Sequence, residues 1–387
     1  MKKTIILLML LIFTTQPISA FAQETEYELD LDTKSVILIE RNTGKVLYEE
    51  NKDTTLPPAS MTKMMTLLLI ADAIEQQKIS LADTVRISEF AASMGGSQIY
   101  LEPNEEMTVD ELLKAVAVGS ANDASVALAE HIYGSEKAFV EAMNNKVVEL
   151  DLANTHFSNT TGLPEENHYS TAHDMAMIAR ALLAYPFITE YTSIYEDYLR
   201  KGTDNEFWLV NTNKLVKFYP GVDGLKTGFT QEAKYCLTAT AQKNDMRLIA
   251  VVMGAESPKL RNSAITKLLD YGFSQFDHKK LYDRHQAVAE IDVLKGKAAK
   301  LAAITQDAVS IVTKKGTNLE QLELKTVVED ELVAPIEAGT ELGKLEIHLD
   351  GELIDEIVLI SEVAIEKASF WQLIKDSTNR LLRQGAH

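Results

Sequence analysis

Residues 60–77 have the sequence SMTKMMTLLLIADAIEQQ and follow directly on Pro57 and Pro58. The run is rich in Met, Leu and Ala, which favour helical structure, and the preceding prolines mark the point where a helix can begin. It therefore predicts a long buried helix. Hydrophobic residues make up 46% of the 387-residue chain, which is ample material for a core around such a helix, and the length suits two or three domains.

Strand patterns lie on both sides of this helix. Two apolar runs, 35–39 and 46–48, flank the turn sequence NTGK and predict a strand pair, and further apolar strands are expected at 235–241 and 247–254. Helical patterns occupy 108–131, 135–150, 171–184 and 258–271. Strands at both ends with helices between them predict an α/β (α+β) layered domain that ends near residue 276.

The sequence pattern changes from about residue 285 onward. Apolar residues alternate with polar ones, as at Ile291 and Val293, and Asp350-Gly351 between two such runs is a hairpin signal. This part predicts a small all-β domain without a chemical motif of its own.

The C-terminal stretch, 363–387, predicts a basic amphipathic helix. The apolar residues at roughly helical spacing are Phe370, Trp371, Ile374, Leu381 and Leu382, and the surrounding cations are Lys367, Lys375, Arg380 and Arg383. Such a helix favours attachment to an anionic membrane surface, and the alternative is a helix packed on its own domain.

The first 22 residues have the layout of a cleavable secretory signal. Lys2 and Lys3 precede an apolar stretch at 5–13, and Ala20-Phe21-Ala22 offers a small-residue cleavage site. An uncleaved anchor is the alternative, but the apolar run is short for a membrane span. The expected organisation is a signal peptide (1–22), a catalytic domain (23–278), a β-rich domain (279–362) and an anchoring helix (363–387), which places the protein outside the cytoplasmic membrane, attached to its outer face.

Charge and cysteine content exclude several classes of function. With 38 Lys and Arg against 57 Asp and Glu, the net charge is −19, and no long basic run is present, so nucleic acid is not expected as a partner. The single cysteine, Cys236, excludes an internal disulfide and a cysteine zinc site. His168 and His173 lack a metal-binding pattern, so we expect structural roles for both, and we expect no metal or organic cofactor.

Three short motifs occur in order: Ser60-x-x-Lys63, Ser120-x-Asn122 and Lys226-Thr227-Gly228. Ser60 stands where the predicted helix starts, and Lys63 follows one turn later on the same face. A hydroxyl needs a nearby base to act as a nucleophile, and a neutral amine one turn away can accept its proton. Because lysine normally titrates near pH 10.4, the site must lower this pKa through burial and a second cation.

The other two motifs supply the remaining groups for acyl transfer. Lys226 is the natural second cation and would attract a substrate carboxylate. Ser120 could relay a proton toward a leaving amine, and the Asn122 amide could hold a substrate amide. Gly228 lets an extended peptide approach the strand that carries it. Together these residues predict acyl transfer through a serine ester.

The sequence resembles the low-molecular-mass penicillin-binding proteins, which are serine D-alanyl-D-alanine carboxypeptidases and share their motif layout with class A β-lactamases. The resemblance is carried by PASMTK (58–63), MGGS (94–97), SANDAS (120–125) and GVDGLKTG (221–228), and it covers essentially the whole chain. Within the family, YEDYLR (195–200) and EAKYC (232–236) resemble the sporulation-associated branch.

The resemblance implies a role for each site residue. Ser60 would be the acylated nucleophile with Lys63 as its base, and the backbone N–H groups of Ser60 and Phe229 would form the oxyanion hole. Thr227 and Arg261 would hold the terminal D-Ala carboxylate. The implied activity is removal of the terminal D-Ala from peptidoglycan stem pentapeptides, which limits cross-linking, and β-lactam antibiotics would acylate the same serine.

Three alternatives remain beside this hypothesis. A β-lactamase or a D,D-endopeptidase could use the same fold, and a catalytically idle wall-binding protein is the non-enzyme alternative, which the intact motif set disfavours. Glu165 and Glu166 invite comparison with the deacylating glutamate of class A β-lactamases. That motif requires Asn four residues later, where this chain has Tyr169 and Ser170, so rapid β-lactam hydrolysis is not expected.

Overall fold

A five-stranded antiparallel sheet forms the centre of the first domain. The computed structural model describes residues 29–374. The strand order is β2-β1-β9-β8-β7, and the strands are β1 (Ser35–Glu40), β2 (Val46–Glu50), β7 (Val222–Thr230), β8 (Lys234–Lys243) and β9 (Met246–Ala255). The four predicted strands are confirmed as β1, β2, β8 and β9, and strands from the two ends of the domain meet where β1 pairs with β9.

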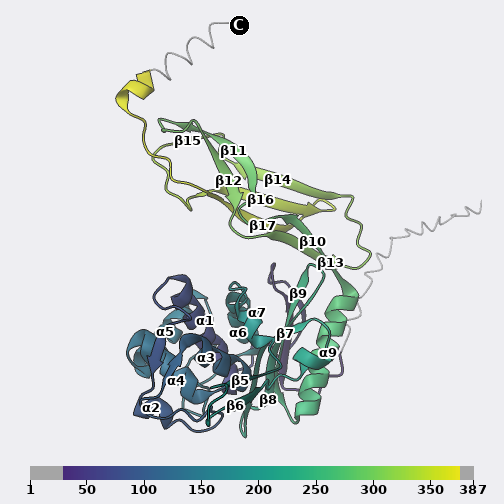
Figure 1. Cartoon of the computed structure of the whole chain (residues 1–387). Coiled ribbons are helices and arrows are strands. Elements are labelled where there is room, and N and C mark those ends of the chain that lie inside the picture. Colours follow the sequence, from purple (N-terminus) through teal and green to yellow (C-terminus); the bar gives the residue numbers. More distant parts are fainter. Residues whose placement is uncertain (1–28, 375–387) are drawn as a thin grey trace, which may run out of the picture. The chain divides into compact units, whose positions relative to one another are not determined.

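Every residue of β1 is buried, which shows that both faces of the sheet are covered at this strand. Side chains alternate between the faces of a strand, so Ile37 and Ile39 join the helical core while Leu38 faces the other way. On that second face, Leu38 lies near Gly272 of α9 (Pro258–Gln275), the last helix of the first domain, which packs on β8 and β9. Figure 1 shows α9 on one side of the sheet and the helices α1 to α6 on the opposite side.

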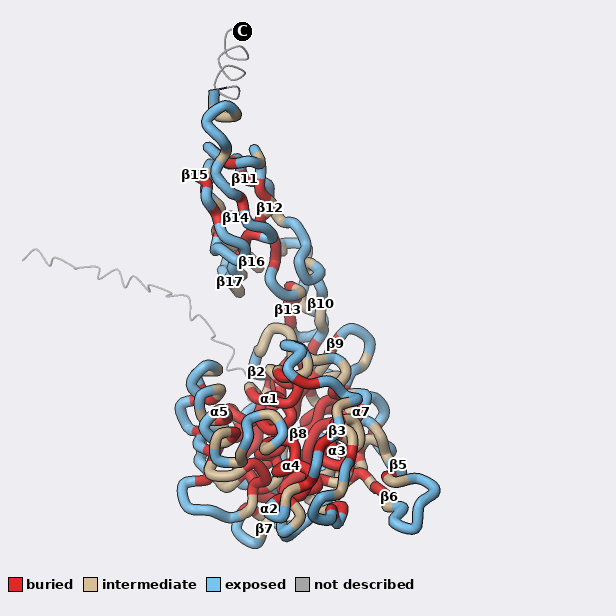
Figure 2. Tube along the Cα trace, turned by 60° about the vertical axis from the view of Figure 1, so that its left-hand side comes forward, coloured by how far each residue is buried: buried red, intermediate tan, exposed pale blue. Residues whose placement is uncertain are grey.

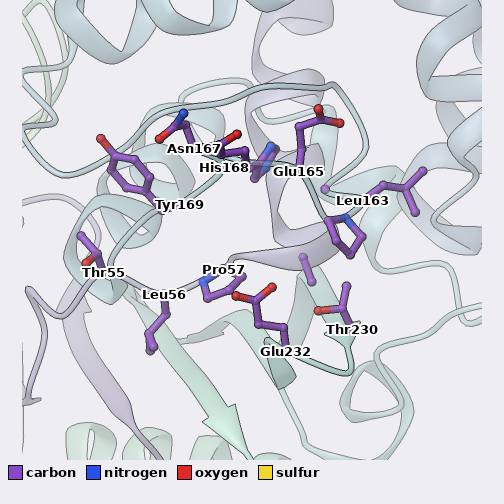
Figure 3. Close-up of a pocket in the computed structure, with 14 residues that line it drawn as sticks. Thr55, Leu56, Pro57, Leu163, Glu165, Asn167, His168, Tyr169, Thr230 and Glu232 are labelled. Atoms are coloured by element: carbon purple, nitrogen blue, oxygen red, sulfur yellow. The ribbon is translucent and has the colours of Figure 1, made fainter.

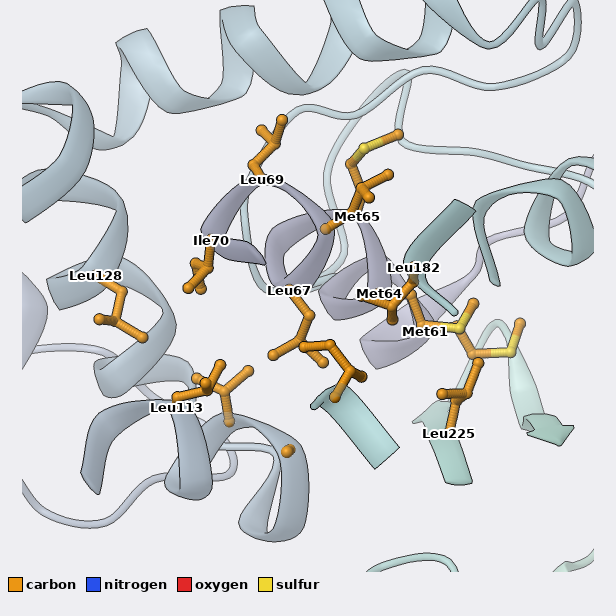
Figure 4. Close-up of a cluster of buried hydrophobic side chains, with 14 of the residues drawn as sticks. Met61, Met64, Met65, Leu67, Leu69, Ile70, Leu113, Leu128, Leu182 and Leu225 are labelled. Carbon is orange, nitrogen blue, oxygen red and sulfur yellow. The ribbon is translucent and has the colours of Figure 1, made fainter. Parts of the chain in front are cut away.

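The predicted central helix is α1 (Lys63–Glu75), and it starts later than expected. Residues Ala59–Thr62 form a 3-10 turn ahead of it, so Ser60 lies in the turn and not in the helix. Most of α1 is buried, and it packs against α4 (Asn122–Tyr133) and α6 (Ala172–Leu182). Figure 4 shows side chains of the helix surrounded by leucines from several elements. The core thus fixes the position of the turn that carries Ser60.

The continuous helix predicted over 108–131 is wrong. The chain instead forms α3 (Val109–Lys114), a π-helical turn (Ala115–Gly119) and α4, and Ser120 separates the last two with left-handed backbone angles (φ 62°, ψ 31°). Left-handed backbone is rare for a residue other than glycine and clusters at functional sites, as do π-turns. The interruption falls on the second motif.

The other helices and the short strands surround this core. The helices predicted at 135–150 and 171–184 are confirmed as α5 (Glu136–Glu149) and α6. The remaining elements are α2 (Glu89–Ala92), α7 (Ile188–Thr192), α8 (Leu215–Phe218), β3 (Thr84–Arg86), β4 (Glu106–Thr108), β5 (Glu196–Leu199) and β6 (Phe207–Val210).

The second domain is all β, as predicted. Its six-stranded sheet has the order β14-β16-β17-β12-β11-β15, and β10 pairs with β13. The strands are β10 (Phe276–Tyr282), β11 (Ala287–Leu294), β12 (Lys300–Thr305), β13 (Val309–Lys314), β14 (Leu322–Val328), β15 (Glu331–Val333), β16 (Glu341–Leu349) and β17 (Glu352–Ser361). The hairpin signal Asp350-Gly351 joins β16 to β17 with positive φ at both residues. Figure 2 shows this domain with fewer buried positions than the first.

The start of the predicted C-terminal helix differs from expectation. Ile365 is buried in the β domain and forms a bridge with Ile336, and Lys367 bridges to Gly296, so this segment is extended. Helical structure begins at Phe370, and the exposed Phe370 and Trp371 rings lie in it. The rest of the predicted helix and the predicted signal peptide lie outside the described residues. Between residues 29 and 374, no helix is long and apolar enough to cross a membrane.

Candidate active site

The first two motifs meet at the side chain of Lys63. Its Nζ lies 3.2 Å from the Ser60 Oγ, 2.6 Å from the Asn122 Oδ1 and 2.7 Å from the carbonyl oxygen of Thr161. Three acceptors therefore surround one amine, and one of them is the predicted nucleophile. The Thr161 carbonyl was not among the residues that the sequence singled out.

The Lys63 amine is fully buried, and burial lowers its pKa well below the usual value of 10.5. The nearby charge of Lys226 lowers this pKa further, and Asp123 opposes the shift. An amine with a lowered pKa carries a lone pair at moderate pH, and this one lies within reach of a hydroxyl proton. The pair can therefore activate a serine.

Asn122 is bonded at both ends of its side-chain amide. Its Oδ1 accepts from Lys63, and its Nδ2 donates to the carbonyl of Gly95 at 2.6 Å. The backbone N–H of Asn122 also donates to the Ser97 carbonyl at 2.7 Å. The sequence suggested that this amide holds a substrate, whereas the geometry uses it to orient Lys63. The MGGS string (94–97) therefore holds Asn122 in place through two backbone carbonyl groups.

Ser120 lies two residues before Asn122, at the break between the π-turn and α4. The following Asp123 is buried, and its carboxylate accepts from the backbone N–H groups of Ile99 (3.0 Å) and Leu101 (3.1 Å). These bonds tie the start of α4 to the neighbouring segment. The unusual backbone at Ser120 is thus held by its surroundings.

Lys226 and Arg261 form a buried cationic region on the third motif. Lys226 Nζ donates to the carbonyl of Thr227 at 2.9 Å, and burial and then the nearby Arg261 lower the Lys226 pKa to about 7. Arg261, from α9, donates from Nε and Nη2 to Asn262 Oδ1, and burial lowers its pKa. Neither cation has a carboxylate partner in the described part of the chain. The region is therefore suited to an anionic ligand.

Thr227 lies beside this region on β7, and its Oγ1 donates to the Oγ1 of Thr212 at 2.7 Å. Thr212 belongs to no recognisable motif, so sequence reasoning missed it. β7 is the last strand of its sheet, with β8 on one side and no strand on the other among residues 29–374. A free edge of this kind can pair with an extended peptide.

Two glycines allow the backbone to close around the Ser60 turn. A Cβ at Gly228 would lie 2.7 Å from the Pro58 carbonyl oxygen, and a Cβ at Gly162 would lie 1.9 Å from the Ala59 carbonyl oxygen. Gly162 also has a positive φ of 83°, which disfavours any side chain. The turn is therefore in contact with β7 on one side and with the loop at Gly162 on the other.

Phe229 follows the third motif, and its side chain is 46% exposed. The ring stacks on that of Tyr235, directly opposite on β8, with 4.4 Å between the ring centroids. The stack fixes the end of β7 next to the predicted oxyanion position.

The remaining polar candidates are structural. The backbone N–H of Ser158 donates to His168 Nδ1, so the proton lies on Nε2 and faces Thr62 Oγ1 at 2.7 Å. Burial, and then the charge of His156, lowers the His168 pKa to about 4, which keeps the ring neutral. Cys236 is buried, and burial raises its thiol pKa to about 11. In the part of the chain that the structure describes, no group of three or more metal-ligating side chains occurs.

Comparison with known proteins agrees with this geometry. The family model described as D-alanyl-D-alanine carboxypeptidase matches residues 21–257, which span all three motifs. The chain belongs to the D-alanyl-D-alanine carboxypeptidase family. A second model, described as the C-terminal domain of penicillin-binding protein 5, matches residues 276–367. The resemblance read from the sequence is therefore confirmed for both domains.

Individual relatives extend the likeness to nearly the whole chain. The D-alanyl-D-alanine carboxypeptidase DacF of Bacillus subtilis is 53% identical over 373 residues, which cover 96% of each protein. The crystal structure of penicillin-binding protein 5 from Haemophilus influenzae is 33% identical and superposes with a TM-score of 0.73, over 88% of this chain and 99% of the other. Penicillin-binding protein D2 of Listeria monocytogenes, solved in its ampicillin-bound form, is 30% identical with a TM-score of 0.57, over 64% of this chain and 99% of that one. The predicted fold class is confirmed.

Proposed function

We propose that this carboxypeptidase-family protein removes the terminal D-Ala from peptidoglycan stem pentapeptides through an acyl-enzyme on Ser60. The observation that supports this most directly is the 3.2 Å approach of the Lys63 amine to the Ser60 hydroxyl, at a site where burial lowers the lysine pKa. The neutral amine takes the hydroxyl proton as the oxygen attacks the carbonyl of the penultimate D-Ala.

The later steps use the groups around this pair. The backbone N–H groups of Ser60 and Phe229 stabilise the negative charge that develops on the carbonyl oxygen. Ser120 passes a proton to the amine of the departing D-Ala, and water then hydrolyses the Ser60 ester. Asn122 keeps the Lys63 amine aimed at the hydroxyl throughout, since its Oδ1 lies only 2.6 Å from Nζ.

Binding of the substrate carboxylate falls to the cationic region. Lys226 and Arg261 are buried without acidic partners among the described residues, and Thr227 presents a hydroxyl beside them. An arriving carboxylate would supply the missing negative charge. The rest of the peptide extends along the free edge of β7.

β-Lactam antibiotics acylate the same serine in this proposal, and the adduct persists. Glu165 and Glu166 lie on the loop after Gly162, but the residue pattern of a deacylating glutamate is absent from the sequence, and neither has a hydrogen bond to Ser60 in the described structure. A penicilloyl adduct on Ser60 that survives for many minutes supports a penicillin-binding carboxypeptidase, whereas turnover within seconds would indicate a β-lactamase.

The decisive experiment is incubation with a pentapeptide muropeptide followed by mass spectrometry. Loss of one D-Ala is the expected result, and the Ser60→Ala variant serves as the control that lacks the nucleophile. Cleavage of a cross-linked dimer without D-Ala loss would replace the proposal with an endopeptidase. An unchanged muropeptide would overturn the proposed activity altogether.

The proposal includes an exported protein that is attached peripherally to the outer face of the cytoplasmic membrane. It is supported by the signal-like residues 1–22, by the basic amphipathic pattern of the tail, and by the exposed Phe370 and Trp371 rings at the start of the tail helix. Aromatic rings and cations together favour an anionic lipid surface.

A further inference from the structure

Thr212 lies in the short segment between β6 and α8, and it contacts two of the three motif regions. Its Oγ1 lies 2.7 Å from the Oγ1 of Thr227 in the third motif. Its backbone N–H donates to the carbonyl of Val118 at 3.4 Å, in the π-turn that leads into Ser120. A residue outside every motif thus joins the strand that carries Thr227 to the turn before the second motif.

Two buried asparagines fix the position of Thr212. The Asn211 Nδ2 donates to two backbone carbonyls at the end of α7 and just after it, at 2.9 and 2.8 Å, and its Oδ1 accepts from the backbone N–H of Asn213 at 2.8 Å. The Asn213 Nδ2 donates to the carbonyl of Gly224 on β7 at 3.0 Å. Because the residues on both sides of Thr212 are held in this way, its hydroxyl is kept against β7.

The two threonine hydroxyls can exchange the roles of donor and acceptor. A hydroxyl has one proton to donate and two lone pairs, and its proton can rotate. In the structure Thr227 donates to Thr212, and the Thr212 proton has no acceptor among the residues that the structure describes. A carboxylate only accepts, so a carboxylate at Thr227 takes the Thr227 proton. The Thr212 proton can then turn to Thr227 Oγ1, and such a chain of hydrogen bonds strengthens the bond to the carboxylate.

The neighbouring cations do not provide this discrimination by themselves. Lys226 and Arg261 attract negative charge, but Coulomb attraction depends on distance and not on the direction of a lone pair. The hydroxyl pair adds a directed donor that is 7% exposed at Thr227. A free carboxylate satisfies both the cations and the directed donor, whereas an ester carries no charge and accepts more weakly.

Thr212 acts at a different place from the pocket beside the Ser60 turn. That pocket, of about 600 Å³, includes Thr230 at the end of β7, together with Pro57 and His168 (Figure 3). Thr212 is not among its lining residues. The contact of Thr212 with Thr227 therefore concerns the end of the substrate that carries the terminal carboxylate.

We propose that Thr212 is a positioning residue for carboxylate recognition. Its hydroxyl donates to Thr227 Oγ1, directs the Thr227 proton toward the terminal carboxylate, and so favours ligands with a free carboxylate over esterified ones. Thr212 needs no contact with the substrate for this role. The inference rests on the proposed function, because that function places the terminal carboxylate at Thr227.

The first test compares two ligands that differ only in this group. Benzylpenicillin has a free carboxylate and its methyl ester does not, while both present the same β-lactam ring to Ser60. The readout is the second-order rate constant of acylation. Thr212→Val keeps the shape of the side chain and removes the hydroxyl. We expect it to slow acylation by benzylpenicillin about five- to tenfold and acylation by the ester less than about twofold, since the change removes one hydrogen bond that supports a charged group.

The second test measures D-Ala release from Nα,Nε-diacetyl-Lys-D-Ala-D-Ala. Thr212→Val should raise KM by about five- to tenfold and leave kcat nearly unchanged, because the carboxylate is held equally in the ground state and the transition state. Thr212→Ser keeps the hydroxyl and should return both constants to within about twofold of the wild type. Thr189→Val removes an exposed hydroxyl that donates to the Pro186 carbonyl, and as the matched control it should behave like the wild type.

Three results would overturn the role of Thr212. They are equal slowing of Thr212→Val with benzylpenicillin and its ester, an unchanged KM in Thr212→Val, and a Thr212→Ser variant as impaired as Thr212→Val. In each case D-Ala release by the wild type would still support the carboxypeptidase. A wild-type protein that releases no D-Ala would overturn the carboxypeptidase activity, and the comparison of benzylpenicillin with its ester would still decide the role of Thr212.

Discussion

Lys63 Nζ lies 2.6 Å from Asn122 Oδ1, which is closer than its 3.2 Å distance from Ser60 Oγ. Together with the Thr161 carbonyl at 2.7 Å, Asn122 fixes the amine in space and leaves one direction open toward the serine. Two of the three motifs are thus joined by a single hydrogen bond between side chains 59 residues apart in sequence.

Replacement of Lys63 by Arg should abolish acylation, although it preserves a positive charge. A guanidinium does not deprotonate in proteins, so it cannot act as the base, and loss of a general base slows a reaction by about 10²–10⁴-fold. Covalent labelling by a fluorescent penicillin measures the effect. Lys52→Arg, at an exposed surface pair, should label like the wild type. Rapid labelling of Lys63→Arg would show that the amine is not the base.

Asn122→Ala should slow acylation by about 100-fold, because the Lys63 amine would lose the contact that aims it and small displacements of reacting groups have costs of this size. The acylation rate by stopped-flow penicillin binding is the measurement. Asn205→Ala, at an exposed loop position, provides the control. A rate within threefold of the wild type would mean that Asn122 does not position Lys63.

Gly162→Ala should impair both stability and acylation. Its Cβ would overlap the Ala59 carbonyl oxygen at 1.9 Å, so the loop or the Ser60 turn must move, and we expect a loss of about 2–3 kcal/mol in the free energy of unfolding. Gly134→Ala is a close control, because Gly134 has nearly the same φ of 80° and open space around it. It should cost about 1 kcal/mol from backbone strain alone and leave acylation unchanged. Equal acylation rates in the two variants would contradict the proposed contact.

Lys226→Met should remove activity and raise thermal stability. Burial lowers the Lys226 pKa from 10.5 to about 7, so between these values the unfolded chain binds more protons than the folded protein, and the stability of the wild type rises with pH. The variant lacks this dependence. Its advantage over the wild type should therefore be largest below pH 7, at about 2–4 °C in Tm, and should disappear near pH 10.5.

Thermal melts at pH 6.5 and pH 10 measure this difference. Lys137→Met, on the exposed side of α5, should show no comparable gain at the lower pH. A Lys226→Met variant that is less stable than the wild type at pH 6.5 would show that the buried cation is compensated in the folded protein.

Removal of residues 369–387 should shift the protein from the membrane fraction to the soluble fraction. The cut lies after the segment in which Ile365 is buried in the β domain, so the domain keeps its packing, whereas a cut at 363 would remove that side chain. Fractionation of cells that express the two forms is the measurement. Replacing only the aromatic pair, by Phe370→Ser and Trp371→Ser in the full-length chain, should give an intermediate partition. An unchanged distribution after truncation would contradict attachment through the tail.

The sequence predicted the parts of the fold that depend on local pattern. The β1–β2 pair was readable because two apolar runs flank a turn sequence, and α5 and α6 were readable because each has a Ser or Thr cap and an apolar periodicity. The continuous helix over 108–131 was wrong because the only unfavourable residue in Ala115–Gly119 is Gly119, and a single glycine costs a helix only about 1 kcal/mol, so the pattern alone does not locate the break. Tertiary contacts, including those of Asp123, set that backbone.

In the site, too, the sequence predicted what depends on local pattern and missed what depends on tertiary contacts. Ser60, Lys63 and Lys226 carry the chemistry in their side chains, so motif spacing could find them. The Thr161 group that holds Lys63 is a backbone carbonyl, which any residue type could supply, and Thr212 meets Thr227 only through the folding of distant segments. Contacts of these two kinds cannot be predicted from a single sequence, because neither depends on a residue pattern.

The contact between Gly162 and Ala59 also bears on how the protein could evolve resistance to β-lactams. Hydrolytic escape requires a carboxylate that holds a water molecule against the ester, and the loop after Gly162 is the segment that faces the Ser60 turn. Because the loop backbone already touches the turn at Gly162, a side chain added there displaces the nucleophile before it can deliver water. A carboxylate that delivers water to the ester would therefore have to come from another position of this loop and not from Gly162.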